Sequence, residues 1–230
     1  MSIAENITKV RKQIREAAQA FSREPAQIHL LAVSKTKPAS AIREAYACQI
    51  TDFGENYLQE ALTKQQELND LKLTWHFIGP IQSNKTKLVA ENFTWVHSVD
   101  RLKIAERLSN QRPEYLPDLN ICLQVNISNE DSKSGCAPEQ LVELARQVSQ
   151  LPKLKLRGLM AIPAPCDDYA EQQQNFAQVR QLLEQIIIEL NLPLDTLSMG
   201  MTHDLQAAVA QGSTWLRIGT AIFGERQYNN

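Results

Sequence analysis

A lysine directly behind a short apolar run is the first residue of this sequence that suggests a chemistry. Lys35 follows the run Ile28–Ser34 and alternates in step with Leu31 and Val33, so these three side chains are expected on one face of a strand. A lysine whose stem lies in apolar surroundings can have a lowered pKa, attack a carbonyl and form a Schiff base. The alternative is a solvated lysine at a strand end, and the neighbouring Lys37 is expected to point to solvent.

Hydroxyl groups and glycines gather in two later segments, Ser198–Thr202 (SMGMT) and Arg217–Thr220 (RIGT). Hydroxyls and glycine N–H groups can cradle a phosphate without a Walker motif, and the sequence has none. The alternative is that Ser198 and Thr202 only cap a helix that begins near Asp204.

A charged residue interrupts the last apolar run. Arg217 has the same parity as Trp215 and Gly219, and a charge in such a strand is costly unless it is ion-paired or faces a ligand. A lysine, a phosphate cradle and an arginine on neighbouring strands are the parts of a pyridoxal phosphate site, in which the arginine faces the pyridine nitrogen. Because arginine cannot accept a proton, that nitrogen would stay unprotonated and the ring would be a poorer electron sink.

These residues must be positioned by a regular alternation of apolar runs and helical patterns. The eight runs predicted as strands are Ile28–Ser34, Thr51–Phe53, Thr74–Ile78, Trp95–Val99, Ile121–Ile127, Leu154–Ala161, Thr196–Met199 and Trp215–Phe223. Five glycines (Gly54, Gly79, Gly158, Gly200 and Gly219) are expected at or near the ends of these strands. Helical patterns lie between the runs at 39–47, 55–68, 83–91, 101–110, 138–150, 169–190 and 204–211, and an extra helix, Ile3–Phe21, precedes them.

Eight strand–helix units in this length favour an α/β fold, a single (β/α)8 TIM barrel with an extra N-terminal helix. No linker or change of composition divides the chain, so residues 1–230 are predicted to form one domain. In such barrels the working groups lie at the C-terminal ends of the strands, where Lys35 and the two later segments are expected to meet.

Composition narrows the class of protein. Twenty-four Lys and Arg residues against 26 Asp and Glu give a net charge of -2, which disfavours a nucleic-acid partner. No apolar run approaches the length of a membrane span, and the charged N-terminus is not a secretory signal. Four scattered cysteines without a CxxC pair argue against a cysteine-based zinc site and favour a reduced, cytoplasmic setting.

The stretches AVSKTKPASAI, FGENYLQEA, WHFIGPIQSNK, SKSG, RGLMAIP, TLSMGM and RIGTAIFGER resemble the YggS/PROSC family of pyridoxal phosphate homeostasis proteins. The resemblance runs from about residue 7 to residue 228 and implies the barrel of the N-terminal domain of alanine racemase, which is fold type III among pyridoxal phosphate proteins. It implies that Lys35 holds the cofactor as an internal aldimine and that Arg217 faces the pyridine nitrogen. The phosphate cradle it implies consists of Ser198, Gly200, Met201, Gly219 and Thr220. One departure is Thr202-His203, where the family often has serine before a variable residue.

Three further positions are candidates for cofactor contacts, each with a structural alternative. Asn56 would reach the ring from the second strand, or cap a helix. His76 would lie near the cofactor, or be a buried histidine satisfied by a neighbour. Met160 would pack against the ring or in the barrel core. Lys85 and Lys133 are expected to be solvated, and His203 to cap or be solvated.

The function that follows is binding of pyridoxal 5'-phosphate in intracellular vitamin B6 homeostasis, without catalytic turnover. Possible recipients are apo-enzymes that need the cofactor, and the chain is expected to be a monomer. One alternative is an amino-acid racemase, but two-base racemisation needs a group on each face of the substrate and only Lys35 is evident. The other is a Schiff-base aldolase acting on a phosphosugar, whose lysine generally lies on a later strand.

Overall fold

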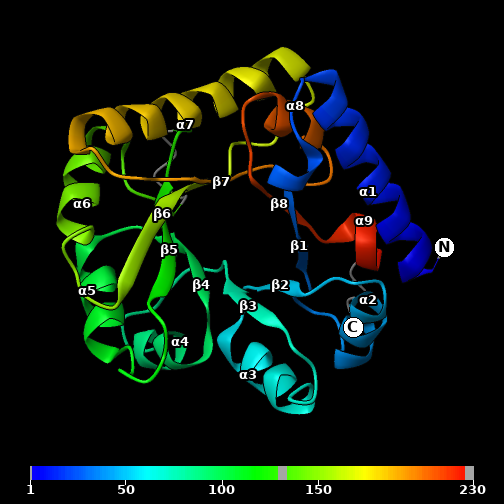
Figure 1. The fold of residues 1–230 in the computed structure, drawn as a ribbon, viewed down its shortest axis with the longest axis horizontal. Coiled ribbons are helices and arrows are strands. Elements are labelled where there is room, and N and C mark those ends of the chain that lie inside the picture. Colours follow the sequence, from blue (N-terminus) through cyan, green and yellow to red (C-terminus); the bar gives the residue numbers. More distant parts are fainter. Residues whose placement is uncertain (1, 129–133, 226–230) are drawn as a thin grey trace.

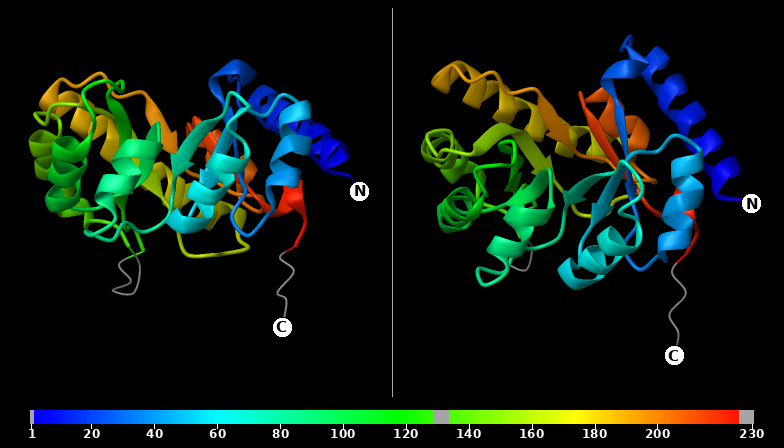
Figure 2. Two further views of the ribbon diagram at one scale, coloured as in Figure 1. Left: turned by 90° about the horizontal axis from the view of Figure 1, so that it is seen from below. Right: turned by 60° about the horizontal axis from the view of Figure 1, so that its bottom comes forward.

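The computed structural model describes residues 2–128 and 134–225. Within them, eight parallel strands pair in chain order and the last closes on the first, so the predicted (β/α)8 barrel is confirmed (Figure 1). The helices surround the barrel on the outside in each view (Figure 2). The strands are β1 (His29–Val33), β2 (Asp52–Glu55), β3 (Thr74–Phe77), β4 (Trp95–Val99), β5 (Leu119–Val125), β6 (Leu154–Ala161), β7 (Thr196–Ser198) and β8 (Trp215–Ile218). The helices are α1 (Ile3–Ala20), α2 (Ala39–Ala47), α3 (Leu58–Glu67), α4 (Thr86–Asn92), α5 (Leu102–Gln111), α6 (Leu141–Val148), α7 (Tyr169–Leu190), α8 (Leu205–Ala210) and α9 (Thr220–Phe223).

Two apolar layers hold these elements together. The larger layer lies between the strands and the helices, and includes Phe53, Val96 and Phe176. The smaller layer fills the barrel interior and consists of Leu31, Ile78, Trp95, Cys122, Met160 and Trp215, with Val33 against it. Because neighbouring side chains on a strand face opposite ways, strands such as β1, β4, β5, β6 and β8 contribute to both layers.

The extra helix is confirmed as α1. Ser2 and Glu5 form a reciprocal capping box at its start, which satisfies two backbone N–H groups. The helix packs against α8 and α9 near the closure of the barrel (Figure 1), where the Asn6 side chain donates to the carbonyl of Ile222. None of the helices in the described part of the chain is long and apolar enough to cross a membrane.

Several predicted boundaries are wrong. The last apolar run was expected as one strand to Phe223, but β8 ends at Ile218 and α9 follows, because a continuous apolar run carries no period that separates strand from helix. The expected helix over 138–150 divides into a 3-10 turn, Pro138–Gln140, and α6.

Not all five glycines mark strand ends. Gly158 lies inside β6, three residues before its end, whereas Gly54 is next to the last residue of β2, as expected. Gly158 has φ +157°, and a Cβ there would lie 1.9 Å from the carbonyl oxygen of Thr196, so this glycine is needed where β6 and β7 approach each other closely.

Candidate functional site

Lys35 lies two residues beyond the end of β1 and is half-buried. Leu31 and Val33 both belong to the interior layer, which confirms the shared face predicted for these two residues. The expectation for Lys37 is wrong, because its ammonium donates to the carbonyls of Phe223 and Glu225 at 3.0 and 2.8 Å. This pair of bonds ties the loop after β1 to the end of α9.

The loop after β8 lies against the same end of β1. Leu31 pairs in register with Arg217, and a Cβ on Gly219 would come within 3.3 Å of the carbonyl oxygen of Val33. The loop after β7 joins them, since the Arg217 N–H donates to the carbonyl of Gly200 at 3.0 Å. The loops that carry Lys35, Gly200 and Gly219 therefore meet at the C-terminal end of the barrel, as the fold class predicted.

Arg217 is buried at this meeting point. Its Nη1 donates to the carbonyl and to the hydroxyl of Ser198, and its Nη2 donates to the carbonyl of Ala161 at 2.9 Å. Burial lowers the pKa of Arg217 to about 10, so the guanidinium stays charged at neutral pH. These bonds use three of its five N–H groups, and nothing among the described residues accepts from the Nε hydrogen or the second Nη2 hydrogen. Arg217 thus has donors left for an acceptor atom of a ligand.

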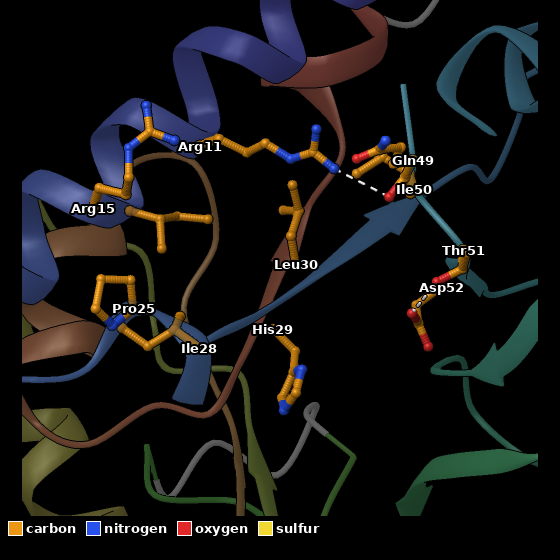
Figure 3. A pocket seen from close by; sticks show the side chains of 11 residues that line it. Arg11, Arg15, Pro25, Ile28, His29, Leu30, Gln49, Ile50, Thr51 and Asp52 are labelled. Atoms are coloured by element: carbon orange, nitrogen blue, oxygen red, sulfur yellow. Dashed lines mark hydrogen bonds between the residues drawn. The ribbon is translucent and has the colours of Figure 1, made fainter. Parts of the chain in front are cut away.

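A chain of hydrogen bonds runs from Arg217 through the barrel interior to the opposite end. Ser198 Oγ lies 2.7 Å from His97 Nδ1, and His97 Nε2 lies 2.9 Å from His76 Nδ1. His76 Nε2 in turn lies 3.1 Å from Asp52 Oδ1. Asp52 lines a pocket between α1 and the starts of β1 and β2, together with Arg11 (Figure 3).

Both ends of this chain require the same direction of hydrogen bonding. The Arg217 guanidinium only donates, so Ser198 Oγ accepts from it and has its own proton for His97. At the other end, the hydrogen bond from His76 lowers the pKa of Asp52 against the effect of its burial, so the carboxylate accepts from His76 Nε2. Burial lowers the pKa of His76 and lowers that of His97 well below its usual value. Both imidazoles are therefore neutral, with the proton on Nε2.

We expect nitrogen NMR shifts to report the Nε2–H tautomer for His76 and His97. Because burial lowers the pKa of both rings, these shifts should change only at a lower pH than those of an ordinary histidine. An Nδ1–H tautomer at either buried ring would contradict the assigned direction of the chain.

Asn56 lies directly after β2, and its Oδ1 is buried without a hydrogen-bond partner. Its backbone is held by close contact with Gly79, where a Cβ would lie 2.2 Å from the Asn56 carbonyl oxygen. The Ser98 hydroxyl donates to the Gly79 carbonyl at 2.5 Å and fixes this loop. An orphaned buried acceptor is costly, so the rim of β2 has a polar atom that a ligand could satisfy.

The residues of the expected phosphate cradle do not all have free polar groups. The Ser198 hydroxyl is engaged by His97 and Arg217, so it belongs to the interior chain and does not cap α8. The Met201 N–H donates to the carboxylate of Asp204. Gly200, with φ +93°, packs against α8, where a Cβ would lie 2.4 Å from that of Ala208.

The remaining candidates divide by burial. Thr220 is exposed in the first turn of α9, beside Gly219. Met160 is fully buried in the interior layer and pairs in register with Ser198. The structure supports the buried alternative for His76, since both ring nitrogens are satisfied and its ring stacks on Trp95 at 5.6 Å. His76 therefore reaches Arg217 only through other residues.

Outside these positions, Lys85 is half-buried and His203 exposed, while Lys133 lies outside the described residues. Asp52 and His97 were not among the residues predicted from the sequence. The signal that could have identified His97 is a second histidine one strand after His76, again inside an apolar run.

Comparison with known proteins decides the family. The profile of the family described as "Alanine racemase, N-terminal domain" matches residues 5–227. This chain belongs to that family. A relative from Pseudomonas aeruginosa, named "Pyridoxal phosphate homeostasis protein", is 67% identical over 227 residues, which cover 99% of this chain and 97% of the relative. A relative of the same name from Escherichia coli is 53% identical over 232 residues, covering 99% and 98%. The resemblance expected from the sequence is thus confirmed.

Solved structures agree with these relatives. PipY of Synechococcus elongatus, solved with PLP bound, is 43% identical to this chain, with a TM-score of 0.86 over 97% of this chain and all of PipY. Alanine racemase of Clostridium difficile shares the fold, with a TM-score of 0.74 at 13% identity, and this chain covers 57% of its length.

Proposed function

We propose that this chain binds pyridoxal 5'-phosphate covalently through Lys35 and serves in intracellular pyridoxal phosphate homeostasis. The observation that carries the proposal is the buried Arg217, which is held by carbonyl and hydroxyl oxygens and still has unused donors. The relatives named "Pyridoxal phosphate homeostasis protein" and the PLP-bound PipY support it.

The residues present fit this cofactor. Pyridoxal phosphate supplies an aldehyde that condenses with a lysine amine, with loss of water. Lys35 would provide that amine, and Arg217 would donate to the pyridine nitrogen, which accepts one hydrogen bond. Asn56 would turn its orphaned Oδ1 toward the ring substituents. Gly219 and Thr220, at the start of α9, would offer backbone N–H groups and a hydroxyl to the phosphate.

The phosphate contacts from the loop after β7 would need one local change. The Met201 N–H is bonded to Asp204, so Met201 would contribute only if this carboxylate released it. Gly200 would hold the loop close to α8, and Ser198 would act through Arg217 rather than on the phosphate. Met160 would pack beneath the site, while His76 would hold His97.

The proposal includes storage and delivery without turnover, in the cytoplasm, by a monomer that passes the cofactor to apo-enzymes. An arginine at the pyridine nitrogen would leave the ring unprotonated and make it a poorer electron sink than a ring that faces an aspartate. Incubation of the cofactor-loaded protein with L-alanine, followed by chiral analysis, should yield no D-alanine above that formed by free pyridoxal phosphate.

The visible absorption spectrum of the purified protein tests the covalent anchor. The wild-type protein is expected to show the band of a lysine-bound cofactor, and Lys35→Ala to lack or shift it. Lys87→Ala, which removes an exposed lysine of α4, is the control and is expected to keep the band. A wild-type protein that stays colourless with added pyridoxal phosphate would overturn the proposal.

A further inference from the structure

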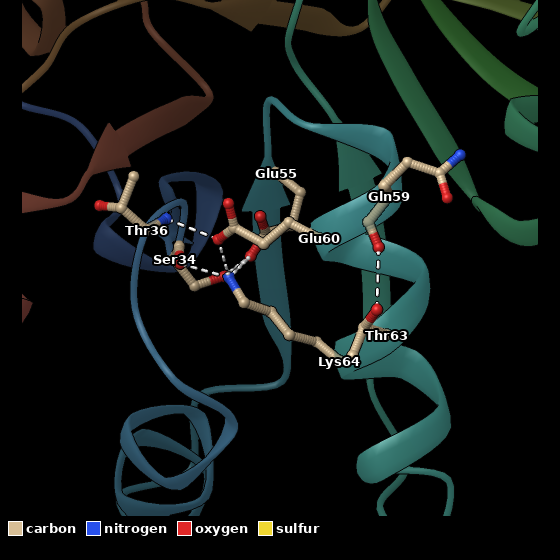
Figure 4. Close-up of polar contacts among 7 residues, drawn as sticks. All are labelled: Ser34, Thr36, Glu55, Gln59, Glu60, Thr63 and Lys64. Atoms are coloured by element: carbon tan, nitrogen blue, oxygen red, sulfur yellow. Dashed lines mark hydrogen bonds and ion pairs between the residues drawn. The ribbon is translucent and has the colours of Figure 1, made fainter.

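A buried lysine that the proposed cofactor site does not use lies beside the anchor loop. The side chain of Lys64, on α3, is only 6% exposed and ends in a buried ammonium group. It donates to the carbonyl of Ser34 at 2.7 Å, to Glu55 Oε1 at 2.7 Å and to Glu60 Oε1 at 2.6 Å (Figure 4). All three of its protons are therefore used, two of them on carboxylates.

The two carboxylates also accept hydrogen bonds from the residues on either side of Lys35. Glu55 Oε1 accepts from the Ser34 hydroxyl at 2.6 Å, and Glu60 Oε1 accepts from the Thr36 backbone N–H at 2.6 Å. One ammonium thus fixes the chain on both sides of Lys35 (Figure 4). We call Lys64, Glu55 and Glu60 the clamp.

The conformation that the clamp holds is one the chain would not adopt unaided. Thr36 has φ +63°, which is unfavourable for a β-branched residue because its side chain crowds the backbone. Such conformations persist where the surroundings over-determine them, and they concentrate at ligand sites. Here the charge-assisted bond from the Thr36 N–H to Glu60 supplies that constraint.

Burial makes the clamp an expensive arrangement for stability alone. Glu55 is fully buried, its Oε2 has no partner, and burial raises its pKa. Buried ion pairs often add little net stability compared with apolar replacements. Because the clamp surrounds Lys35, its role is better explained by a need for a fixed backbone conformation at Lys35 than by stability.

We propose that Lys64, with Glu55 and Glu60, is a positioning group that sets the backbone of Lys35 for attachment of the cofactor. This inference rests on the proposed role of Lys35. The clamp touches neither the cofactor nor the Lys35 amine in this proposal. It fixes the turn at Thr36, and that turn sets the direction in which the lysine side chain leaves the backbone.

The test uses the double variant Lys64→Met with Glu55→Gln, which removes the ammonium without leaving a buried carboxylate uncompensated. In the cofactor-free protein, hydrogen exchange at the Thr36 amide is expected to accelerate about tenfold or more, since its acceptor is no longer held. Attachment of pyridoxal phosphate, followed by absorption, is expected to slow by about tenfold as geometry is lost. Lys87→Met, which removes an exposed lysine paired with Glu91, is the control and should change neither rate.

A third variant tests the reason for the effect. Thr36→Gly in the double-variant background is expected to restore part of the attachment rate, because glycine adopts positive φ without strain. A folded double variant with wild-type amide exchange and wild-type attachment would overturn the clamp. The exchange measurement needs no cofactor, so it separates failure of the clamp from failure of Lys35 as the anchor, which Lys35→Ala reports by itself.

Discussion

Replacing Gly79 by alanine is expected to destabilise the protein by about 3 kcal/mol or more and to weaken cofactor binding with it. The added Cβ would lie 2.2 Å from the carbonyl oxygen of Asn56, and the next two closest atoms also belong to the Asn56 backbone. A backbone overlap cannot be relieved by a side-chain rotation, so the loops after β2 and β3 must separate. Urea denaturation measures the first effect and titration with pyridoxal phosphate the second.

Gly212→Ala is the matched control for this substitution. Gly212 has φ +94°, and its added Cβ would find only ordinary contacts, the nearest at 3.6 Å. That variant carries conformational strain without overlap, which costs about 1–2 kcal/mol, and it lies away from Asn56. It should therefore leave cofactor affinity unchanged. Equal losses of stability and affinity in the two variants would contradict the close approach of Gly79 to Asn56.

The architecture could be predicted because each strand–helix unit leaves its own trace in the sequence. Eight apolar runs separated by helical patterns admit few topologies besides a closed parallel barrel. The wrongly predicted element boundaries lie where one pattern of residues is compatible with both a strand and a helix. The run from Trp215 to Phe223 is mostly apolar along its whole length, although it contains β8, Gly219 and α9.

The site could be predicted where a single residue conflicts with its surroundings. Lys35 and Arg217 are charges placed in or directly after apolar strands, and both lie at the same end of the barrel. The histidine chain had no such signal, because positions 52, 76, 97 and 198 are neighbours only after the barrel closes. Lys64 was equally hidden, since a lysine on a helix is ordinarily a solvated residue.

The clamp and the histidine chain hold the proposed cofactor site from two sides. The clamp acts on the loop after β1 through the backbone around Lys35. The histidine chain acts on β8 through the side chain of Arg217. Neither group needs to touch the cofactor, and both are buried, so their geometry is set by the fold before any ligand binds.

Acidification is expected to destabilise the protein through the two buried histidines of the histidine chain. His76 and His97 have folded-state pKa values lowered chiefly by burial, so the unfolded chain binds protons first as the pH falls below about 6.5. Stability is then complete above this pH and is lost below it, by about 1.4 kcal/mol per pH unit for each histidine until its folded pKa is reached. Glu55 acts in the opposite sense at lower pH, because its raised pKa lets the folded state bind a proton first.

A difference measurement isolates the histidine contribution. His97→Gln removes one titrating ring and keeps an amide that can donate to His76, so the variant should be less stable than the wild type at pH 7 but less sensitive to acid. We expect the slope of unfolding free energy between about pH 6.5 and 5.5 to fall by about 1 kcal/mol per pH unit in the variant, because the unfolded histidine is only half protonated at the upper end of this range. Urea midpoints across this range supply the slope. Parallel curves of unfolding free energy against pH for wild type and variant would mean that His97 has the same pKa in the folded and the unfolded state. That result would contradict the assignment of His76 and His97 as buried, neutral groups whose hydrogen bonds fix the donors of Arg217.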